Sequence, residues 1–203
     1  MNSIFWNFSA IIRVKVRENE ECKMDFKEKT LSTENIYNGK VVHLDKETVK
    51  LPNGKEAVRE VIRHQGAVGV IAITDSNKIV MIRQWREPLK KVTLEIPAGK
   101  IEPSEHDDPE KTARRELNEE TRFAADQFEL VTKFYTSPGF ADELMYLYHA
   151  VGLKAVKDEL PQDDDEFLEL VELSPKEVQE AISRGEICDA KTLMAVMFWQ
   201  MMG

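Results

Sequence analysis

Three glutamates spaced within about one helical turn are the residues of this sequence best placed to do chemistry. Glu116, Glu119 and Glu120 stand at positions i, i+3 and i+4, so in a helix their carboxylates share one face. Three negative charges so close repel one another, and a hard divalent cation relieves that repulsion. Carboxylate oxygens, completed by water and substrate phosphates, suit Mg²⁺. The alternative is an acidic helix face in contact with solvent, which the glutamates alone would favour.

The glutamates fall within the clearest predicted helix of the sequence, from Pro109 to Thr121. Asp108 is expected to be the N-cap residue, Pro109 suits the first helical position, and Glu110 favours the first turn. The helix would hold the three carboxylates in a constant relation to the elements packed against it.

Strands are predicted before this helix. The segment Thr30–His64 alternates β-forming and polar residues around a turn at Pro52-Asn53-Gly54, which indicates a small antiparallel sheet. A second hairpin is predicted from the apolar run Ala67–Thr74, a turn at residues 75–77, and Ile79–Gln84. The continuous apolar run indicates a strand buried on both faces.

Further strands and helices are predicted after the helix. Ser174 begins a capping box with Glu177, which marks the start of a helix. The other expected elements are strands at Phe128–Tyr135, Leu144–Val151 and Phe167–Leu173, an acidic loop at Asp158–Glu166, and a last helix at Ala190–Met202. The pattern predicts a mixed α/β domain with helices on both faces of the sheet, preceded by a strand-rich arm.

Composition narrows the class of protein. With 203 residues, 42% of them hydrophobic, we expect one catalytic domain plus an appendage. The formal net charge of −9 argues against nucleic acid as a partner, because such binding uses clustered Lys and Arg. Cys22 and Cys188 lie far apart, so we expect free thiols in a reducing cytoplasm, and no segment resembles a signal peptide or a membrane span. We expect three parts: an N-terminal extension (1–23) that a misassigned start codon could have added, a dimerisation arm (24–64) and a catalytic domain (65–203).

A longer motif surrounds the three glutamates. It favours a metal site over the solvent-exposed acidic helix face that the glutamates alone would favour. The residues resemble the Nudix box, G-x5-E-x7-R-E-U-x-E-E-x-G-U with U a bulky aliphatic residue, and they are Gly99, Glu105, Arg115, Glu116, Leu117, Glu119 and Glu120. Nine residues, not seven, separate Glu105 from Arg115, which leaves the register of Glu105 open. Arg122 stands where the family has glycine, and a left-handed conformation there would cost about 1 kcal/mol or move the helix end.

Segments on both sides of the box point to a subfamily. Glu95–Lys100 is similar to the E-x-P-A-G entry of bacterial ADP-ribose pyrophosphatases, and Ser137–Glu143 is similar to their S-P-G-x-x-D-E segment. The resemblance implies a Nudix-type α/β/α sandwich that hydrolyses ADP-ribose to AMP and ribose 5-phosphate, with Mg²⁺ as the cofactor and Mn²⁺ as a substitute. Alternatives are a Nudix hydrolase of another nucleoside diphosphate sugar or oxidised nucleotide, and a non-catalytic protein that senses ADP-ribose.

The resemblance also implies roles for individual residues. The metal ligands would be the backbone carbonyl of Ala98 and the carboxylates of Glu116, Glu119 and Glu120, with Glu119 also counted as catalytic. Arg115 would pair with a neighbouring carboxylate and orient it. Glu166, with Asp165 as the alternate, would be the general base near the attacking water, although a run of acids in a loop is usually just solvated.

Substrate contacts follow from the same resemblance. Arg86 would contact a phosphate and Arg59 the adenosine end, since a guanidinium suits phosphate oxygens better than an ammonium does. The remaining substrate-binding residues would be Ser137, Gly139 and Glu143. The mechanism needs no covalent intermediate, and we assign structural roles to the histidines. The resemblance also implies a homodimer formed through the N-terminal strands.

Overall fold

A computed structural model describes residues 25–157, 160 and 167–202. The extension predicted at 1–23 and the loop residues Asp165 and Glu166 lie outside the described residues. The strands are β1 Lys29–Asn38, β2 His43–Lys50, β3 Glu56–Arg63, β4 Ala67–Ala72, β5 Ile79–Arg86, β6 Lys91–Glu95, β7 Ala98–Lys100, β8 Phe123–Tyr135, β9 Leu144–Ala155 and β10 Glu169–Leu173. The helices are α1 Pro109–Thr121, α2 Pro175–Ser183 and α3 Ala190–Met202, with short 3₁₀ turns η1 Glu87–Leu89 and η2 Pro103–Glu105.

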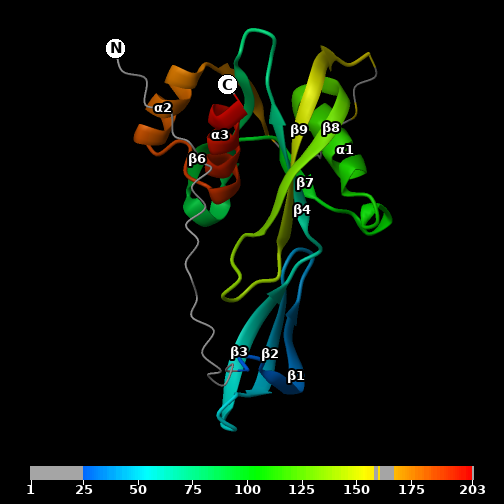
Figure 1. Cartoon of the computed structure of the whole chain (residues 1–203), viewed down its shortest axis with the longest axis vertical. Coiled ribbons are helices and arrows are strands. Elements are labelled where there is room, and N and C mark those ends of the chain that lie inside the picture. The colour runs from blue at the N-terminus through cyan, green and yellow to red at the C-terminus, as the bar shows by residue number, and fades with distance from the viewer. Residues whose placement is uncertain (1–24, 158–159, 161–166, 203) are drawn as a thin grey trace, which may run out of the picture.

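The described residues form three sheets, and one of them stands apart from the others as an arm (Figure 1). The arm is the antiparallel sheet β1-β2-β3, which confirms the prediction for this segment. The other two sheets have the orders β10-β5-β6 and β7-β4-β9-β8. In the second of these sheets β4 and β9 pair in parallel, whereas β4 with β7 and β8 with β9 pair antiparallel, so this sheet is mixed, as predicted.

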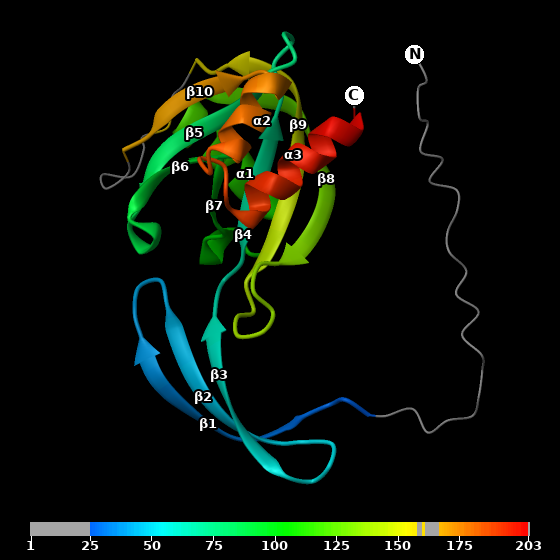
Figure 2. The same cartoon turned by 90° about the vertical axis from the view of Figure 1, so that its left-hand side faces the viewer.

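Strand β4 forms the centre of the α/β part of the chain, which follows the arm, and it supplies side chains to two cores. Val68 and Val70 pack into a core with Leu117 of α1. Ile71 packs into a second core with Trp199 of α3 and with residues of α2. Helix α1 therefore covers one face and α2 with α3 the other, as Figure 2 shows, and the predicted α/β/α sandwich is confirmed.

The prediction that β4 and β5 form a hairpin is wrong. Strand β4 pairs with β7 and β9, whereas β5 pairs with β6 and β10, and only the isolated bridge Ile73–Ile79 joins the two segments. The turn itself is present, since Thr74 N donates to Lys78 O at 2.9 Å. A turn sequence specifies a reversal of the chain but not continued pairing, and two strands with long buried apolar runs can each lie inside a different sheet.

The arm is joined to the α/β part through the segment Ser137–Glu143. Ile62 N donates to Phe140 O at 2.7 Å, and Asp142 N donates to Ile62 O at 3.1 Å. Arg63 Nη1 donates to Asp142 Oδ2 at 3.1 Å, while the same guanidinium also pairs with two acids of β2. These contacts hold the end of β3 against the α/β part, so the residues that follow β3 enter that part at a defined place.

Helix α1 has the bounds expected from the sequence, with Asp108 at the N-cap position and Pro109 first. The side chain of Asp108 makes no capping hydrogen bond, contrary to its expected role. Arg122 adopts the left-handed conformation (φ 60°, ψ 24°), and its N–H donates to Asn118 O at 2.9 Å, so the helix ends where a glycine would end it. The capping box at α2 is confirmed: Ser174 N donates to Glu177 Oε2 at 2.8 Å.

Replacing Arg122 by glycine should yield a more stable protein than replacing it by alanine. Both variants lose the side chain, including its hydrogen bond to Leu160 O, but only glycine adopts positive φ without steric cost. We expect a difference of about 1 kcal/mol in the free energy of unfolding by urea, or about 2–4 °C in Tm. Equal stability of the two variants would show that the backbone conformation carries no cost.

None of the helices among the described residues is long and apolar enough to cross a membrane.

Candidate active site

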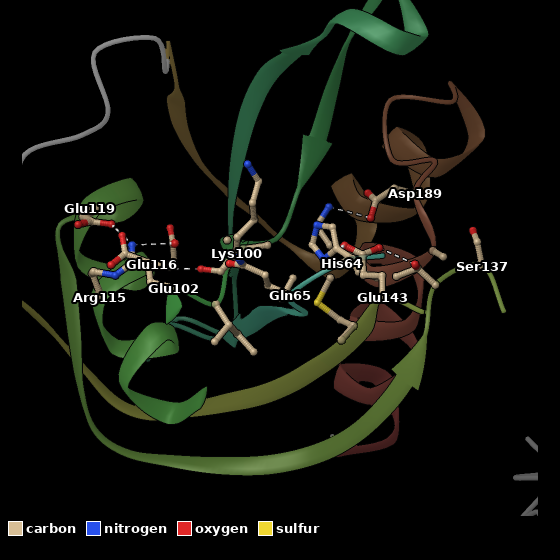
Figure 3. Close-up of a pocket in the computed structure, with 18 of the residues that line it drawn as sticks. His64, Gln65, Lys100, Glu102, Arg115, Glu116, Glu119, Ser137, Glu143 and Asp189 are labelled. Carbon is tan, nitrogen blue, oxygen red and sulfur yellow. Dashed lines mark hydrogen bonds and ion pairs between the residues drawn. The ribbon is translucent and has the colours of Figure 1, made fainter. Parts of the chain in front are cut away.

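A cavity of about 660 Å³ lies where α1, β7, the end of β3, the loop before β9 and the start of α3 meet (Figure 3). At one end of the view lie Arg115, Glu116 and Glu119 of α1, and at the other lie His64, Glu143 and Asp189. The volume is within the range of sites that bind small molecules. The cavity thus has an acidic wall on α1 and a separate end built from segments distant in the sequence.

Arg115 organises the carboxylates of α1. Its Nη1 donates to Glu116 Oε1 at 2.8 Å and to Glu119 Oε2 at 2.7 Å. Its Nε and Nη2 donate to the two oxygens of Glu105 at 3.2 and 3.1 Å. Burial opposes the charged form of Arg115, but the hydrogen bond with Glu105 and the charges of Glu116 and Glu119 outweigh it and raise the pKa. One guanidinium therefore sets the positions of three carboxylates.

The register of Glu105 is resolved by the same contacts. Glu105 ends the turn η2, is 8% exposed, and also accepts a hydrogen bond from Thr112 Oγ1 at 2.9 Å. Hydrogen bonding from Arg115, the main cause, lowers the pKa of Glu105 despite partial burial. The two extra residues of the motif are accommodated between η2 and α1, and they do not displace Glu105 from Arg115.

The backbone of β7 lies against the same helix face. Glu120 Oε2 accepts a hydrogen bond from Ala98 N at 2.9 Å. At Gly99, an added Cβ would lie only 1.9 Å from Glu116 Oε1 and 2.0 Å from its Cδ. The glycine of the motif is thus explained by close approach, because no other residue leaves room for the Glu116 carboxylate.

The donor atoms on this wall fit a hard divalent cation, since they are carboxylate oxygens beside a backbone carbonyl. Among the described residues, no three acidic, histidine or cysteine side chains converge as a ready set of ligands. Arg115 holds Glu116 and Glu119, and Glu120 bonds to the backbone of Ala98, so a cation would have to compete with these contacts. The metal assignment to these residues stays a prediction.

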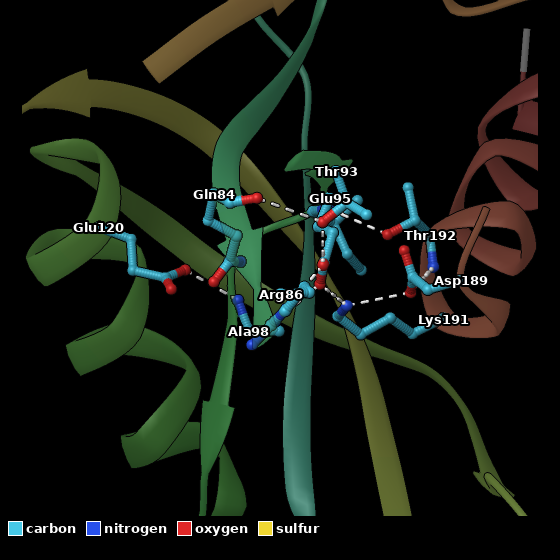
Figure 4. Close-up of polar contacts among 10 residues, drawn as sticks. Gln84, Arg86, Thr93, Glu95, Ala98, Glu120, Asp189, Lys191 and Thr192 are labelled. Atoms are coloured by element: carbon cyan, nitrogen blue, oxygen red, sulfur yellow. Dashed lines mark hydrogen bonds and ion pairs between the residues drawn. The ribbon is translucent and has the colours of Figure 1, made fainter. Parts of the chain in front are cut away.

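The wall built from β5, β6 and α3 carries a buried ionic network (Figure 4). Glu95, which is 2% exposed, accepts hydrogen bonds from Arg86 Nε and Nη2, both at 2.7 Å. It also accepts from Thr93 Oγ1 at 2.7 Å and from Lys191 Nζ. Lys191 Nζ in turn donates to Asp189 Oδ1 at 2.9 Å. Burial alone would raise the pKa of Glu95, but Arg86 and Lys191 lower it from its ordinary value of 4.5 to about 2.

The depressed pKa makes Glu95 a source of stability that acid removes. The contribution is fully present above pH 4.5 and is lost as the pH falls toward 2, because protonation is then more favourable in the unfolded chain. The expected loss is on the order of 3 kcal/mol. Urea unfolding of the wild type and of Glu95→Gln at pH 7, 5, 4 and 3 measures it. The gap between the two proteins should shrink with acidification, and a constant gap would refute the assignment.

Some of the predicted substrate-binding residues line the cavity and others do not. Arg86, Ser137 and Glu143 line the cavity. Gly139 is not among its lining residues. Arg59 lies on β3 in the arm, where it forms an ion pair with Glu28 at 2.5 Å and is also absent from the lining. Arg59 therefore does not reach the cavity of its own chain.

Several lining residues were not predicted, above all His64, Gln65, Asp189 and Lys191. His64 was assigned a structural role, yet it lies in the cavity, where its Nδ1 accepts a hydrogen bond from Gly66 N at 3.1 Å. Its position directly after the arm was the only signal available. Asp189 precedes the last helix, and a helix start indicates a cap rather than a site.

Known protein families and proteins are similar to this chain over most of its length. A family model described as "NUDIX domain" matches residues 63–195, and one described as "Nucleoside diphosphate sugar hydrolase N-terminal domain" matches residues 28–62. A methanol dehydrogenase activator of Bacillus methanolicus is 50% identical over 176 residues, which are 87% of this chain and 94% of that protein. An ADP-ribose pyrophosphatase of Bacillus subtilis (strain 168) is 45% identical over 174 residues, which are 86% of this chain and 93% of that protein.

More distant proteins are also similar to this chain over most of its length. A GDP-mannose pyrophosphatase of Cronobacter sakazakii (strain ATCC BAA-894) is 31% identical and covers 71% of this chain and 82% of its own length. The crystal structure of an ADP compounds hydrolase superposes with a TM-score of 0.76 at 21% identity, covering 87% of this chain and 94% of the other, and it shows the fold.

The matched family models and the relative with 45% identity place the protein among the hydrolases. The chain belongs to the Nudix hydrolase family, as its box predicted. Hydrolases of this family generally use divalent metal ions.

Proposed function

We propose that the protein hydrolyses the pyrophosphate bond of ADP-ribose, giving AMP and ribose 5-phosphate, with Mg²⁺ as its metal and Mn²⁺ as a substitute. The observation that carries the proposal is one cavity lined by Glu116 and Glu119 of α1, by Arg86, and by Ser137 and Glu143. The relative with 45% identity, named ADP-ribose pyrophosphatase, supports the same substrate. Retention of Glu116, Glu119 and Glu120 argues against a non-catalytic sensor.

In the proposed mechanism each wall of the cavity has its own task. Glu116, Glu119, Glu120 and the carbonyl of Ala98 would hold the divalent cation, which when bound would neutralise phosphate oxygens and lower the pKa of a coordinated water. Arg115 keeps Glu116 and Glu119 in place through its Nη1 contacts of 2.8 and 2.7 Å. Arg86, oriented by Glu95, binds a phosphate oxygen. Glu166, with Asp165 as the alternate, accepts the proton of the attacking water.

A product assay tests the substrate. Purified protein with Mg²⁺ is incubated with ADP-ribose, ADP-glucose, GDP-mannose and oxidised nucleotides, and the nucleotide and sugar phosphate products are separated by chromatography. We expect ADP-ribose to give the highest kcat/KM. If another compound turns over rapidly and ADP-ribose hardly at all, the proposed substrate is wrong but the proposed pyrophosphate hydrolysis stands.

A second candidate function is activation of a methanol dehydrogenase, which the name of the relative with 50% identity suggests. Adding the protein with Mg²⁺ to such a dehydrogenase, and measuring the rate of methanol oxidation, tests this candidate. A rate that does not change removes it.

We also propose that residues 24–64 form a dimerisation arm, residues 65–203 the hydrolase domain, and that two chains associate through the arm in the cytoplasm. Strand β1 is exposed along its whole length, and the arm exposes Leu31, Ile36, Tyr37 and Val58. An exposed strand edge with apolar side chains favours association. Arg59 would then reach the cavity of the partner chain. Analytical ultracentrifugation that finds a monomer at micromolar concentration would overturn this arrangement.

A further inference from the structure

Two cations from distant parts of the chain hold one buried carboxylate at the cavity wall (Figure 4). Arg86 comes from the end of β5 and Lys191 from the first turn of α3, and both donate to Glu95 of β6. Arg86 and Lys191 also line the cavity that contains the α1 carboxylates. The motifs of the family explain Arg86 and Glu95, but they include no residue of α3.

The cations retain donors beyond those that Glu95 uses. Arg86 donates to Glu95 through Nε and Nη2, and Nη1 makes no hydrogen bond within the described part of the chain. Lys191 has three N–H donors, and two of them serve Glu95 and Asp189. One edge of the guanidinium and one ammonium hydrogen thus remain for a ligand in the cavity.

The position of Lys191 is held by the backbone around it. Ile96 N donates to the buried Thr192 Oγ1 at 3.2 Å, and Leu94 N donates to Glu186 O at 2.9 Å, so the start of α3 is bonded to β6. Asp189 Oδ1 accepts from Thr192 N at 3.1 Å as well as from Lys191 Nζ. The Lys191 side chain is 12% exposed. A cation held this firmly loses little freedom when it binds a ligand.

The ligand class follows from charge. The α1 side of the cavity is acidic and repels a phosphate, whereas Arg86 and Lys191 stand together on another wall. A guanidinium edge beside an ammonium suits a group with several adjacent anionic oxygens. We propose that Lys191 acts with Arg86 to bind the diphosphate group of the substrate, so that the first turn of α3 is part of the substrate site. The proposal deepens the proposed function and rests on it for the identity of the substrate.

Binding measured without divalent metal tests the role of Lys191. ADP-ribose and inorganic pyrophosphate are titrated calorimetrically, in EDTA, into the wild type, Lys191→Gln, Lys191→Arg and Lys91→Gln. Loss of one charged hydrogen bond should weaken binding of both probes to Lys191→Gln about tenfold or more. Lys191→Arg, which keeps the charge, should bind both probes nearly as well as the wild type.

Lys91 is a matched control. It lies on β6, donates to Gly185 O at 3.1 Å in the same region of the chain, and is not among the cavity-lining residues. Lys91→Gln should bind like the wild type, and urea unfolding should show all variants folded. Unchanged binding by Lys191→Gln, equal losses in Lys191→Gln and Lys191→Arg, or no binding of either probe to the wild type would overturn the proposal.

The two proposals fail separately. If the wild type cleaves ADP-ribose while Lys191→Gln binds it normally, the reaction stands and the role of Lys191 is wrong. If the wild type does not cleave ADP-ribose, but its affinity for pyrophosphate depends on the charge of Lys191, the substrate is wrong and the diphosphate site stands.

Discussion

Glu120→Gln should lower kcat for ADP-ribose hydrolysis at least about 10²-fold, as expected for removal of a group that stabilises the transition state. The glutamine amide keeps the shape of the side chain, and its oxygen can still accept the hydrogen bond that Ala98 N now gives to Glu120 Oε2 at 2.9 Å. It loses the negative charge that the carboxylate would contribute to binding a divalent cation. Steady-state rates at saturating Mg²⁺ measure the effect.

Glu110→Gln is the matched control for Glu120→Gln. Glu110 lies on the same helix but forms an ion pair with Arg114 at 2.7 Å, whereas Glu120 accepts a hydrogen bond from Ala98, a residue that lines the cavity. Its variant should keep the rate of the wild type. If Glu120→Gln also kept that rate while remaining folded, the carboxylate of Glu120 would not be a metal ligand, and the metal site would have to lie elsewhere.

Local signals explain why helix α1 could be predicted with its correct ends. Pro109 is compatible with the first helical position, and the spacing of Leu117 and the glutamates is that of a helix. The residue after the helix departs from the family glycine, yet Arg122 takes the same left-handed conformation. The backbone bonds at the helix end therefore outweigh the preference of a single side chain, which a sequence alone does not reveal.

Pairing between distant strands was beyond local signals. A turn joins the two apolar runs of β4 and β5, and this pattern predicts a hairpin. In the structure each run is interior to a different sheet. Short strands such as β7, Ala98–Lys100, have too few residues to show a period. The wrong pairing of β4 with β5 and the absence of a prediction for β7 have the same cause, because tertiary contacts decide which strands pair.

The site residues that belong to contiguous sequence motifs could be predicted. The residues that only the fold brings to the cavity could not. The carboxylates of α1, Arg86 and Glu143 belong to recognisable segments, and all of these segments meet at the cavity. His64 and Lys191 reach it only because β3 ends and α3 begins there. Neither residue lies in a motif, so only the three-dimensional arrangement could bring them into the candidate site.

Gly99→Ala should lower kcat for ADP-ribose hydrolysis about 10²-fold in a protein that remains folded. The new Cβ would occupy the place of the Glu116 carboxyl group, 1.9 Å from Oε1, and the clash is relieved most easily by moving the end of that flexible side chain. Displacement of a metal-binding group by about 1 Å can cost about 10²-fold in rate. Overpacking itself should cost about 1–3 kcal/mol in the free energy of unfolding. Steady-state kinetics and urea unfolding of the same preparation separate the two effects.

A double-mutant cycle with Glu116→Gln shows whether Gly99 acts through Glu116. If the methyl group harms catalysis by displacing this carboxylate, adding Gly99→Ala to Glu116→Gln should cause little further loss of kcat, because the group it displaces has already lost its charge. Independent effects would instead multiply. Multiplying losses would mean that Gly99 serves the site in another way, such as through the backbone conformation of β7, and the explanation of the motif glycine by close approach to Glu116 would be wrong.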